Sequence, residues 1–128
     1  MGSTPASRTS PESFGNGAVV LTSDRNAKEN FKPVDARAVL DKVTALPISQ
    51  WNYKQDTSME HIGPMAQDFY AAFGVGPDNK HIATVDADGV ALAAIQGLNQ
   101  KLNEKDAEIQ ALKQSVAELK ETLTQQLN

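Results

Sequence analysis

The C-terminal third of the chain carries a heptad repeat. Apolar residues recur seven positions apart at one seam position, and the second seam position, three residues later, is apolar in most repeats. A helix of this kind buries its apolar stripe only against other helices. The pattern therefore predicts a coiled-coil helix over residues 91–128 that assembles with further copies of the chain. The expected coil residues are Ile95, Leu98, Leu102, Ile109, Leu112, Val116, Leu119 and Leu123.

The charges beside this seam favour a parallel arrangement. Lys101 with Asp106, and Glu108 with Lys113, stand at the five-residue offset that bridges neighbouring helices of a parallel coil. Such pairs are formed between chains and not within one helix. A single helix that packs only on its own domain is the competing interpretation, and the number of repeats disfavours it.

The number of chains in the coil stays open on the heptads alone. Isoleucine or valine at the first seam position with leucine at the second favours two helices. Leucine at two first positions weakens that preference, as do Lys105 and Gln126 at second positions. Dimer and trimer both remain compatible with the repeat.

The length and net charge of the chain limit the number of domains and the kinds of partner that can be expected. With 128 residues, 40% of them hydrophobic, the chain has material for one small domain with an appendage. The net charge of −4 leaves no basic surface to neutralise phosphates, so nucleic acid is not expected as a partner. No apolar run approaches the roughly 20 residues that span a bilayer, so no membrane contact is expected either.

The metal-binding and redox residues are sparse. The chain has no cysteine, which removes disulfides, thiolate nucleophiles and cysteine-based zinc sites. His61 and His81 lie twenty residues apart and make a poor ligand set. The run DADG (Asp86–Gly89) has part of the pattern of a calcium loop, without the remaining ligands. No metal or cofactor is therefore expected.

The middle of the chain predicts short helices and strands, so that the fold class is α+β. Residues 1–20, rich in Ser, Thr, Gly and Pro, are expected to be a disordered leader or linker, and residues 21–90 a globular domain. Helical spacing predicts an amphipathic helix from Asp35 to Leu46 and a second helix from Pro64 to Gly74. Alternation of polar and apolar residues predicts a half-buried strand from Ile48 to Lys54, with Trp51 in the core.

The segment before the coil is expected to be irregular. The run HIATV (residues 81–85) reads as a candidate strand, and Asp86–Gly89 as a turn. The long helix is accordingly expected to begin near Val90. The complete architecture expected is a small α+β domain followed by one long helix.

The stretch LTSDRNAKENF (residues 21–31) gathers side chains suited to hydroxyl chemistry. A serine hydroxyl needs a base, and a lysine can serve when burial or nearby positive charge lowers its pKa. Ser23 and Lys28 form such a candidate pair, provided that a turn brings them together. Arg25 would disfavour the charged ammonium and donate to an oxyanion, and Asp24 would orient Arg25.

A purely structural interpretation of the same stretch competes with this one. Serine and aspartate are favoured helix caps, and Asn26 with Glu29 fits a capping box. Isolated Ser and Lys pairs are common, so spacing alone favours the structural interpretation. The residues by themselves predict an oligomeric stalk with a candidate Ser/Lys site.

Four segments resemble a known family when they are taken together. They occur in the order SDRNAKENF, VLDKVTALPISQWNYK, HIGPMAQDFYAAFG and VDADGVALAAIQGLNQKL. They are similar to the intramolecular chaperone and auto-processing domain at the C-terminus of phage tailspikes, tail fibres and endosialidases, which is also found in myelin regulatory factor. The similarity covers residues 21–102 and continues in character into the coil.

The resemblance implies a homotrimer that helps an N-terminally attached fibre or spike to fold and then releases itself. The implied cleavage lies between Thr22 and Ser23, with Ser23 as nucleophile and Lys28 as general base. Asp24, Arg25 and His61 are implied as supporting residues. The family's pattern of Ser-Asp-x-Arg-x-Lys is matched incompletely, because Arg25 stands at its variable position.

Two other functions compete with self-cleavage. One is a trimerisation and folding module that does not cleave, and the other is a transcription factor like myelin regulatory factor, which the acidic balance disfavours. The implied trimer also takes precedence over the weak dimer preference of the heptads. A phage source would make the chain a virion precursor assembled in the bacterial cytoplasm.

Overall fold

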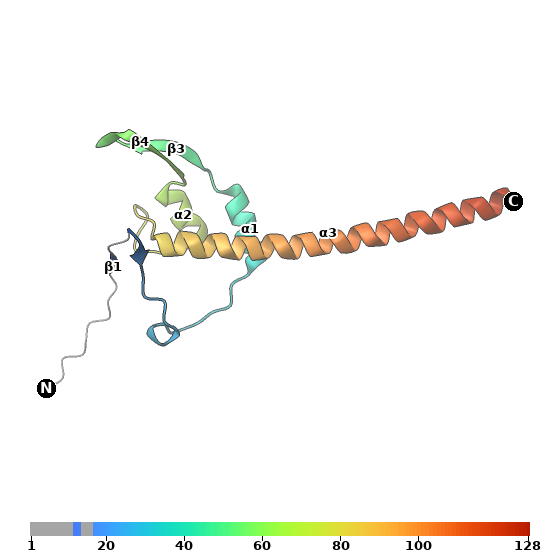
Figure 1. The fold of residues 1–128 in the computed structure, drawn as a ribbon, viewed down its shortest axis with the longest axis horizontal. Helices are drawn as coiled ribbons and strands as arrows, with labels where there is room; N and C mark the ends of the chain where they lie inside the picture. Colours follow the sequence, from blue (N-terminus) through green and yellow to red (C-terminus); the bar gives the residue numbers. More distant parts are fainter. Residues whose placement is uncertain (1–11, 14–16) are drawn as a thin grey trace. The chain divides into compact units, whose positions relative to one another are not determined.

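The computed structural model describes residues 12–13 and 17–128, which fall into two units. The first unit ends at Pro33 and the second runs from Val34 to Asn128. Figure 1 labels most of the helices and strands. Most of the leader expected over residues 1–20 lies outside the described residues.

The first unit contains two very short strands and one helical turn. Strand β1 (Glu12–Ser13) pairs antiparallel with β2 (Val19–Val20), so that Ser13 lies opposite Val19. The turn is the 3-10 helix η1 (Arg25–Ala27). The short strands place an ordered segment directly before the expected cleavage site.

The second unit begins with helix α1 (Ala36–Ala45), which confirms the amphipathic helix expected there. The carboxylate of Asp35 caps it by accepting a hydrogen bond of 3.2 Å from the amide of Ala38. Ala36 and Leu40 are buried one turn apart, and they face helix α3. Pro47 follows the last turn, as expected for a residue that cannot continue a helix.

A β-hairpin follows α1. Strand β3 (Ser49–Tyr53) confirms the predicted strand and pairs antiparallel with β4 (Asp56–Gly63), which the sequence pattern did not predict. Trp51 lies opposite His61 and donates from Nε1 to the carbonyl of Gly63 at 3.3 Å. Trp51 is half-buried and lies outside the apolar core, so the expectation that it anchors the core is wrong.

Helix α2 (Ala66–Phe73) confirms the second predicted helix. Phe69 is its buried residue, and its ring contacts that of Phe73 at a centroid distance of 5.0 Å. The helix ends at Gly74, which has the left-handed φ of 63° that favours glycine, and whose amide donates to the carbonyl of Tyr70. The buried apolar residues among those described are Ala36, Leu40, Phe69 and Ala94.

Helix α3 (Thr84–Leu127) is 44 residues long, or about 66 Å at 1.5 Å per residue. It begins six residues before Val90, so the strand expected at residues 81–85 and the turn expected at Asp86–Gly89 are both wrong. The carbonyl of Ala83 accepts the amides of Asp86 and Ala87, and Asp86 is favoured in the first turn by the helix dipole. Gly89 is tolerated inside the helix.

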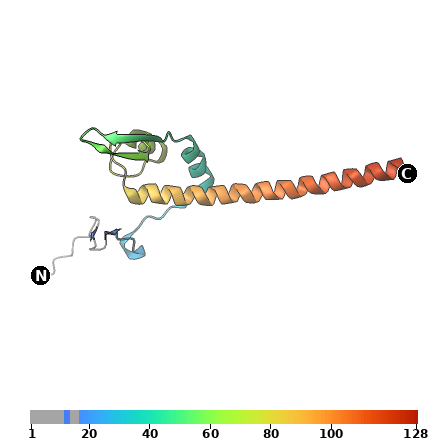
Figure 2. The ribbon, with the colours of Figure 1, turned by 45° about the horizontal axis from the view of Figure 1, so that its top comes forward.

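Within the second unit, α1 packs against α3 at Gly97, and Figures 1 and 2 both show the two helices side by side. Figure 2 shows that the C-terminal half of α3 extends beyond the other helices and the hairpin. None of the helices in the described ranges is long and apolar enough to cross a membrane. The predicted fold class, a small α+β part followed by a long helix, is confirmed.

Candidate functional site

The ammonium of Lys28 meets the hydroxyl of Ser23. Lys28 Nζ donates to Ser23 Oγ at 2.7 Å, although five positions separate the two residues. An extended chain of that length would hold the groups far apart. The turn η1 between them therefore creates the contact.

Asp24 builds this turn. Its Oδ1 accepts the amide of Asn26 at 2.9 Å, and its backbone carbonyl accepts the amide of Ala27 at 3.0 Å. The amide of Lys28 then donates to the carbonyl of Arg25 at 3.2 Å. The structural interpretation named aspartate as a favoured cap, and Asp24 is the cap of this turn, whereas the capping box of Asn26 and Glu29 does not cap it.

Capping and hydroxyl chemistry are compatible in this arrangement. Because Asp24 caps the turn, the Ser23 side chain is not needed as a cap and contacts Lys28. Thr22, Ser23 and Lys28 are all exposed in the single chain. A lysine acts as a base only after its ammonium loses a proton, which removal from water favours. Ser23 and Lys28 are thus in contact, and removal of the pair from water would favour the neutral amine that can act as a base.

The two remaining supporting residues lie in different units. Arg25 is the first residue of η1, and its carbonyl helps to close the turn. His61 lies in β4, with its ring centroid 5.1 Å from that of Trp51 and 5.4 Å from that of Tyr53. These contacts give His61 a structural role in the hairpin. Its part in the chemistry stays a prediction.

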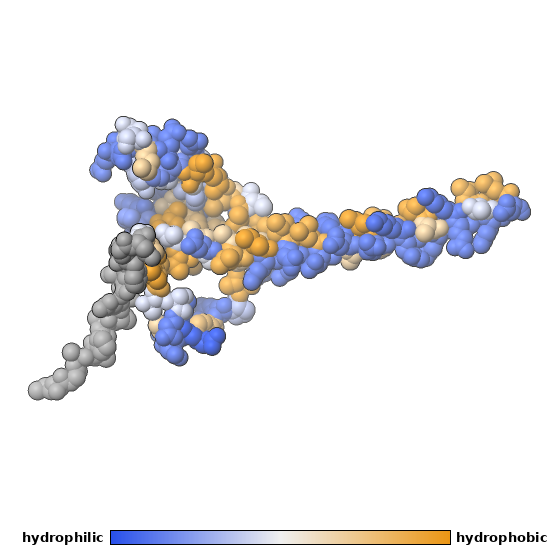
Figure 3. All heavy atoms as spheres, in the orientation of Figure 1, coloured by the Kyte–Doolittle hydropathy of each residue, from blue (hydrophilic) through white to orange (hydrophobic). Residues whose placement is uncertain are grey.

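The seam of α3 is open along its length. The eight expected coil residues are exposed by between 47% and 69%. Figure 3 shows apolar side chains recurring along this helix. Gly97, against which α1 packs, and the buried Ala94 stand at heptad positions outside the two seam positions. Helix α1 and the seam therefore use different faces of α3, and packing within the chain does not compete with assembly.

An ion pair fixes α1 along α3. Arg37 Nη1 lies 2.7 Å from Glu104 Oε1. This contact raises the pKa of the Arg37 guanidinium and lowers the pKa of the Glu104 carboxyl, in both cases chiefly through the hydrogen bond. Glu104 lies seven residues beyond Gly97, so α1 contacts α3 over about two turns of that helix.

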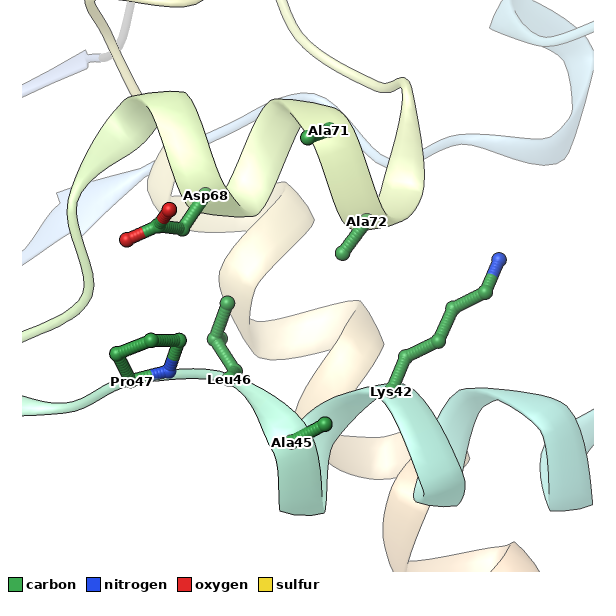
Figure 4. A pocket seen from close by; sticks show the side chains of 7 residues that line it. All are labelled: Lys42, Ala45, Leu46, Pro47, Asp68, Ala71 and Ala72. Carbon is green, nitrogen blue, oxygen red and sulfur yellow. The ribbon is translucent and has the colours of Figure 1, made fainter.

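A shallow groove separates the end of α1 from α2 (Figure 4). Lys42 and Asp68 lie toward its opposite ends, and apolar side chains line the space between them. The lining has no hydroxyl nucleophile, so the groove offers no second Ser/Lys site. Within the described ranges no group of three side chains suits a metal ion, and Asp86 and Asp88 lie in a regular helix instead of a calcium loop.

A comparison with known families matches part of the chain. A peptidase family model described as the chaperone of endosialidase matches residues 23–76. The matched segment begins at Ser23 and includes η1, α1, the hairpin and α2. The match confirms the resemblance drawn from the sequence over these residues. The search of curated proteins found no relative of the chain.

Proposed function

We propose that this chain is an intramolecular chaperone that trimerises through α3, assists the folding of an N-terminally attached fibre or spike, and releases itself by cutting between Thr22 and Ser23. The match of residues 23–76 to the chaperone of endosialidase supports the chaperone role. The observation that carries the proposed cleavage is the 2.7 Å contact between Lys28 Nζ and Ser23 Oγ.

The position of Ser23 defines the proposed reaction. Lys28, as a neutral amine, takes the hydroxyl proton while Ser23 Oγ attacks the carbonyl carbon of Thr22. The new C–O bond replaces the C–N bond to Ser23, whose nitrogen receives the proton from Lys28. Water then hydrolyses this ester, which leaves a Thr22 carboxylate, a free Ser23 amine and the restored hydroxyl. Each chain reacts once.

The width of the apolar face on α3 supports more than two helices. In the first half of the helix, Val85 and Leu92 are exposed by 51% and 64% and flank the seam on one side. A two-stranded coil needs only the two seam positions, whereas larger bundles bury a third position per heptad. The globular part of the second unit lies along this wider half (Figure 2).

Assembly of the trimer gives a physical reason why cleavage would follow folding. Ser23 and Lys28 are exposed in the single chain, and a neighbouring copy that covers them would exclude water and favour the neutral amine. A misplacement of about 1 Å can cost about a hundredfold in rate. Cleavage would then report that the trimer has formed.

The test is a precursor with a folded reporter fused ahead of Met1. We expect a fragment whose N-terminal residue is Ser23, and no fragment from Ser23→Ala or Lys28→Arg. Arginine keeps the positive charge but does not act as a base at neutral pH. Ser115→Ala is the matched control, because it removes a serine hydroxyl from α3 and should leave cleavage unchanged. Cleavage in both site variants would refute the Ser/Lys pair.

The exposure of Ser23 and Lys28 also supports an alternative, a folding and trimerisation module that does not cleave. Light scattering on the intact chain separates the parts of the proposal. A mass three times the 13.8 kDa of the chain is expected. Trimers that leave the Thr22–Ser23 bond intact would establish the alternative, and a mass of two or four chains would contradict the trimer.

A further inference from the structure

One residue interrupts the apolar seam of α3. Lys105 stands at the second seam position, with apolar layers on both sides of it along the helix. Its ammonium lies 3.3 Å from Glu108 Oε2, and both side chains are more than half exposed in the single chain. Lys105 also follows Glu104, at which α1 is attached to α3. It therefore marks the boundary between the half of α3 that carries the globular part and the half that extends freely.

We propose that Lys105 fixes the alignment of the chains in the coil, so that they assemble parallel and in register. The inference rests on the proposed coil. The apolar seam alone would stabilise the parallel, antiparallel and slipped alignments about equally, and Lys105 is the residue that distinguishes them. A single polar residue in a seam is known to specify register and oligomer state at a cost in stability.

When the helices are parallel and in register, the free-energy cost of placing a charged residue in the seam falls on a single layer of the coil. All copies of Lys105 then meet at the same height, where each ammonium can turn outward along its flexible stem toward a Glu108 carboxylate at the edge of the seam. Every other complete layer from Ile95 to Leu123 remains apolar. The charge is thus paired and partly solvated.

The strongest competitor is an antiparallel alignment, because it preserves the full overlap of the helices. The first seam position of one helix then meets the second seam position of its neighbour, and overlap of residues 95–126 sets Lys105 against Val116. Lys105 would then stand in two layers, each time beside Val116, instead of in one. Burying a charged side chain is costly even when it is paired, so an alignment that disrupts two apolar layers is disfavoured. A slip by one heptad likewise sets Lys105 against leucine layers.

The alignment matters for the rest of the chain. The packing of Ala36 on Gly97 and the Arg37–Glu104 ion pair hold α1 against α3. The elements that follow α1 in the second unit are therefore carried with the helix. Only the parallel alignment in register brings these parts of all copies to the same end and the same height, as a site completed by neighbouring chains requires.

The absence of cysteine from the sequence allows a direct test. Val116→Cys in the full chain places one thiol per copy in a seam layer. In the parallel register all three thiols adjoin, so a reagent with three maleimide groups should link all three chains of a trimer. In a trimer with one inverted or slipped chain, the third thiol lies in a different layer and at most two chains can be linked; the linked fraction is therefore the share of chains in three-chain products.

We expect Lys105→Leu, in the Val116→Cys background, to lower the linked fraction to less than about half of its parent value, because the penalty on the other alignments is removed. Lys105→Gln keeps a polar layer and should retain the linked fraction. Lys120→Leu is the matched control, since it replaces the same residue type at a position beside the seam and should also retain it. Circular dichroism establishes that each variant is helical.

The outcomes separate this inference from the proposed function. An unchanged linked fraction in Lys105→Leu would overturn the role of Lys105 and leave the trimer intact. An equal loss in Lys105→Gln would also overturn it, because polarity would then not be the property that matters. A reduced, unlinked parent that scatters light as a monomer would instead refute the proposed coil.

Discussion

The carbonyl of Ala36, at the start of α1, lies against the Cα atom of Gly97 in α3, closer than any side chain at position 97 would permit. The Cβ atom of Leu40 lies 3.1 Å from the point that a Cβ atom on residue 97 would occupy. Glycine inside a helix costs about 1 kcal/mol relative to alanine. The close approach of α1 offsets this cost, so Gly97 is the residue that allows the two helices to pack.

Gly97→Ala should therefore destabilise the chain. The new methyl group would overlap the backbone of Ala36, and α1 would have to move away from α3. We expect a loss of about 1–3 kcal/mol in the free energy of unfolding, measured by urea denaturation. Gly89→Ala is the control, since no atom outside the local helix lies within 4 Å of the point that its new methyl group would occupy, and it should stabilise α3 by up to about 1 kcal/mol. Equal effects of the two substitutions would contradict the packing argument.

The Arg37–Glu104 ion pair predicts a dependence of stability on pH. The hydrogen bond from Arg37 holds the pKa of Glu104 below its ordinary value of 4.5. A carboxyl with a lowered pKa in the folded chain stabilises the fold above its ordinary pKa, and loses this contribution as the pH falls from there toward the folded value. The melting temperature of the parent should exceed that of Glu104→Gln at pH 7, and the difference should shrink below about pH 4.5.

Glu118→Gln is the matched control for this titration. Glu118 lies in the same helix, but its hydrogen-bond partner is the uncharged amide of Gln114. Its removal should change the melting temperature little at any of these pH values. A parent and a Glu104→Gln variant with parallel pH curves would show that the ion pair does not stabilise the attachment of α1.

The periodicity of apolar residues correctly predicted the elements whose apolar side chains lie on one face. Helices α1 and α2 and strand β3 follow their patterns closely, and so does the coil half of α3. Strand β4 was missed because its exposed residues show no alternation of polar and apolar types. The start of α3 was misplaced because Asp86 and Gly89 are typical turn residues. The helix dipole and the length of the helix outweigh that local preference.

The candidate site was predictable in its residues but not in its geometry. The spacing of Ser23 and Lys28 allowed contact only through a turn, and the sequence offered serine or aspartate as a cap as well as a capping box of Asn26 and Glu29. The structure assigns the cap to Asp24, two residues before the amide that it accepts. Aspartate and asparagine cap about equally well, so composition alone does not decide between them. The sequence pattern also did not indicate the face of α3 against which α1 packs, because Gly97 carries no apolar side chain.

The open seam predicts that assembly can be abolished without unfolding the chain. Leu112 is 65% exposed in the single chain, so Leu112→Lys should leave the helix content of the separated chains intact. In the coil it would place one charge per chain in an apolar layer, and association should weaken by at least about a hundredfold. Light scattering over a concentration series measures this change.

Ala111→Lys provides the comparison, one residue away on α3. Ala111 is exposed and stands outside both seam positions, so the same charge there should remain in water. We expect the mass of the assembly to be unchanged. Dissociation by both substitutions would indicate a general effect of charge and contradict the assignment of the seam.

The turn that joins Ser23 to Lys28 predicts a graded loss of cleavage in a reporter-fused precursor. Asp24→Ala removes the acceptor for the amide of Asn26 and should loosen η1, and loss of a cap typically costs about 0.5–2 kcal/mol. Because small displacements of a base are costly, the rate at which the Ser23 N-terminus appears should fall about 10- to 100-fold. Asp24→Asn keeps the acceptor and should retain most of the rate. If Asp24→Asn were as slow as Asp24→Ala, the carboxylate charge and not the cap would be the feature that cleavage requires.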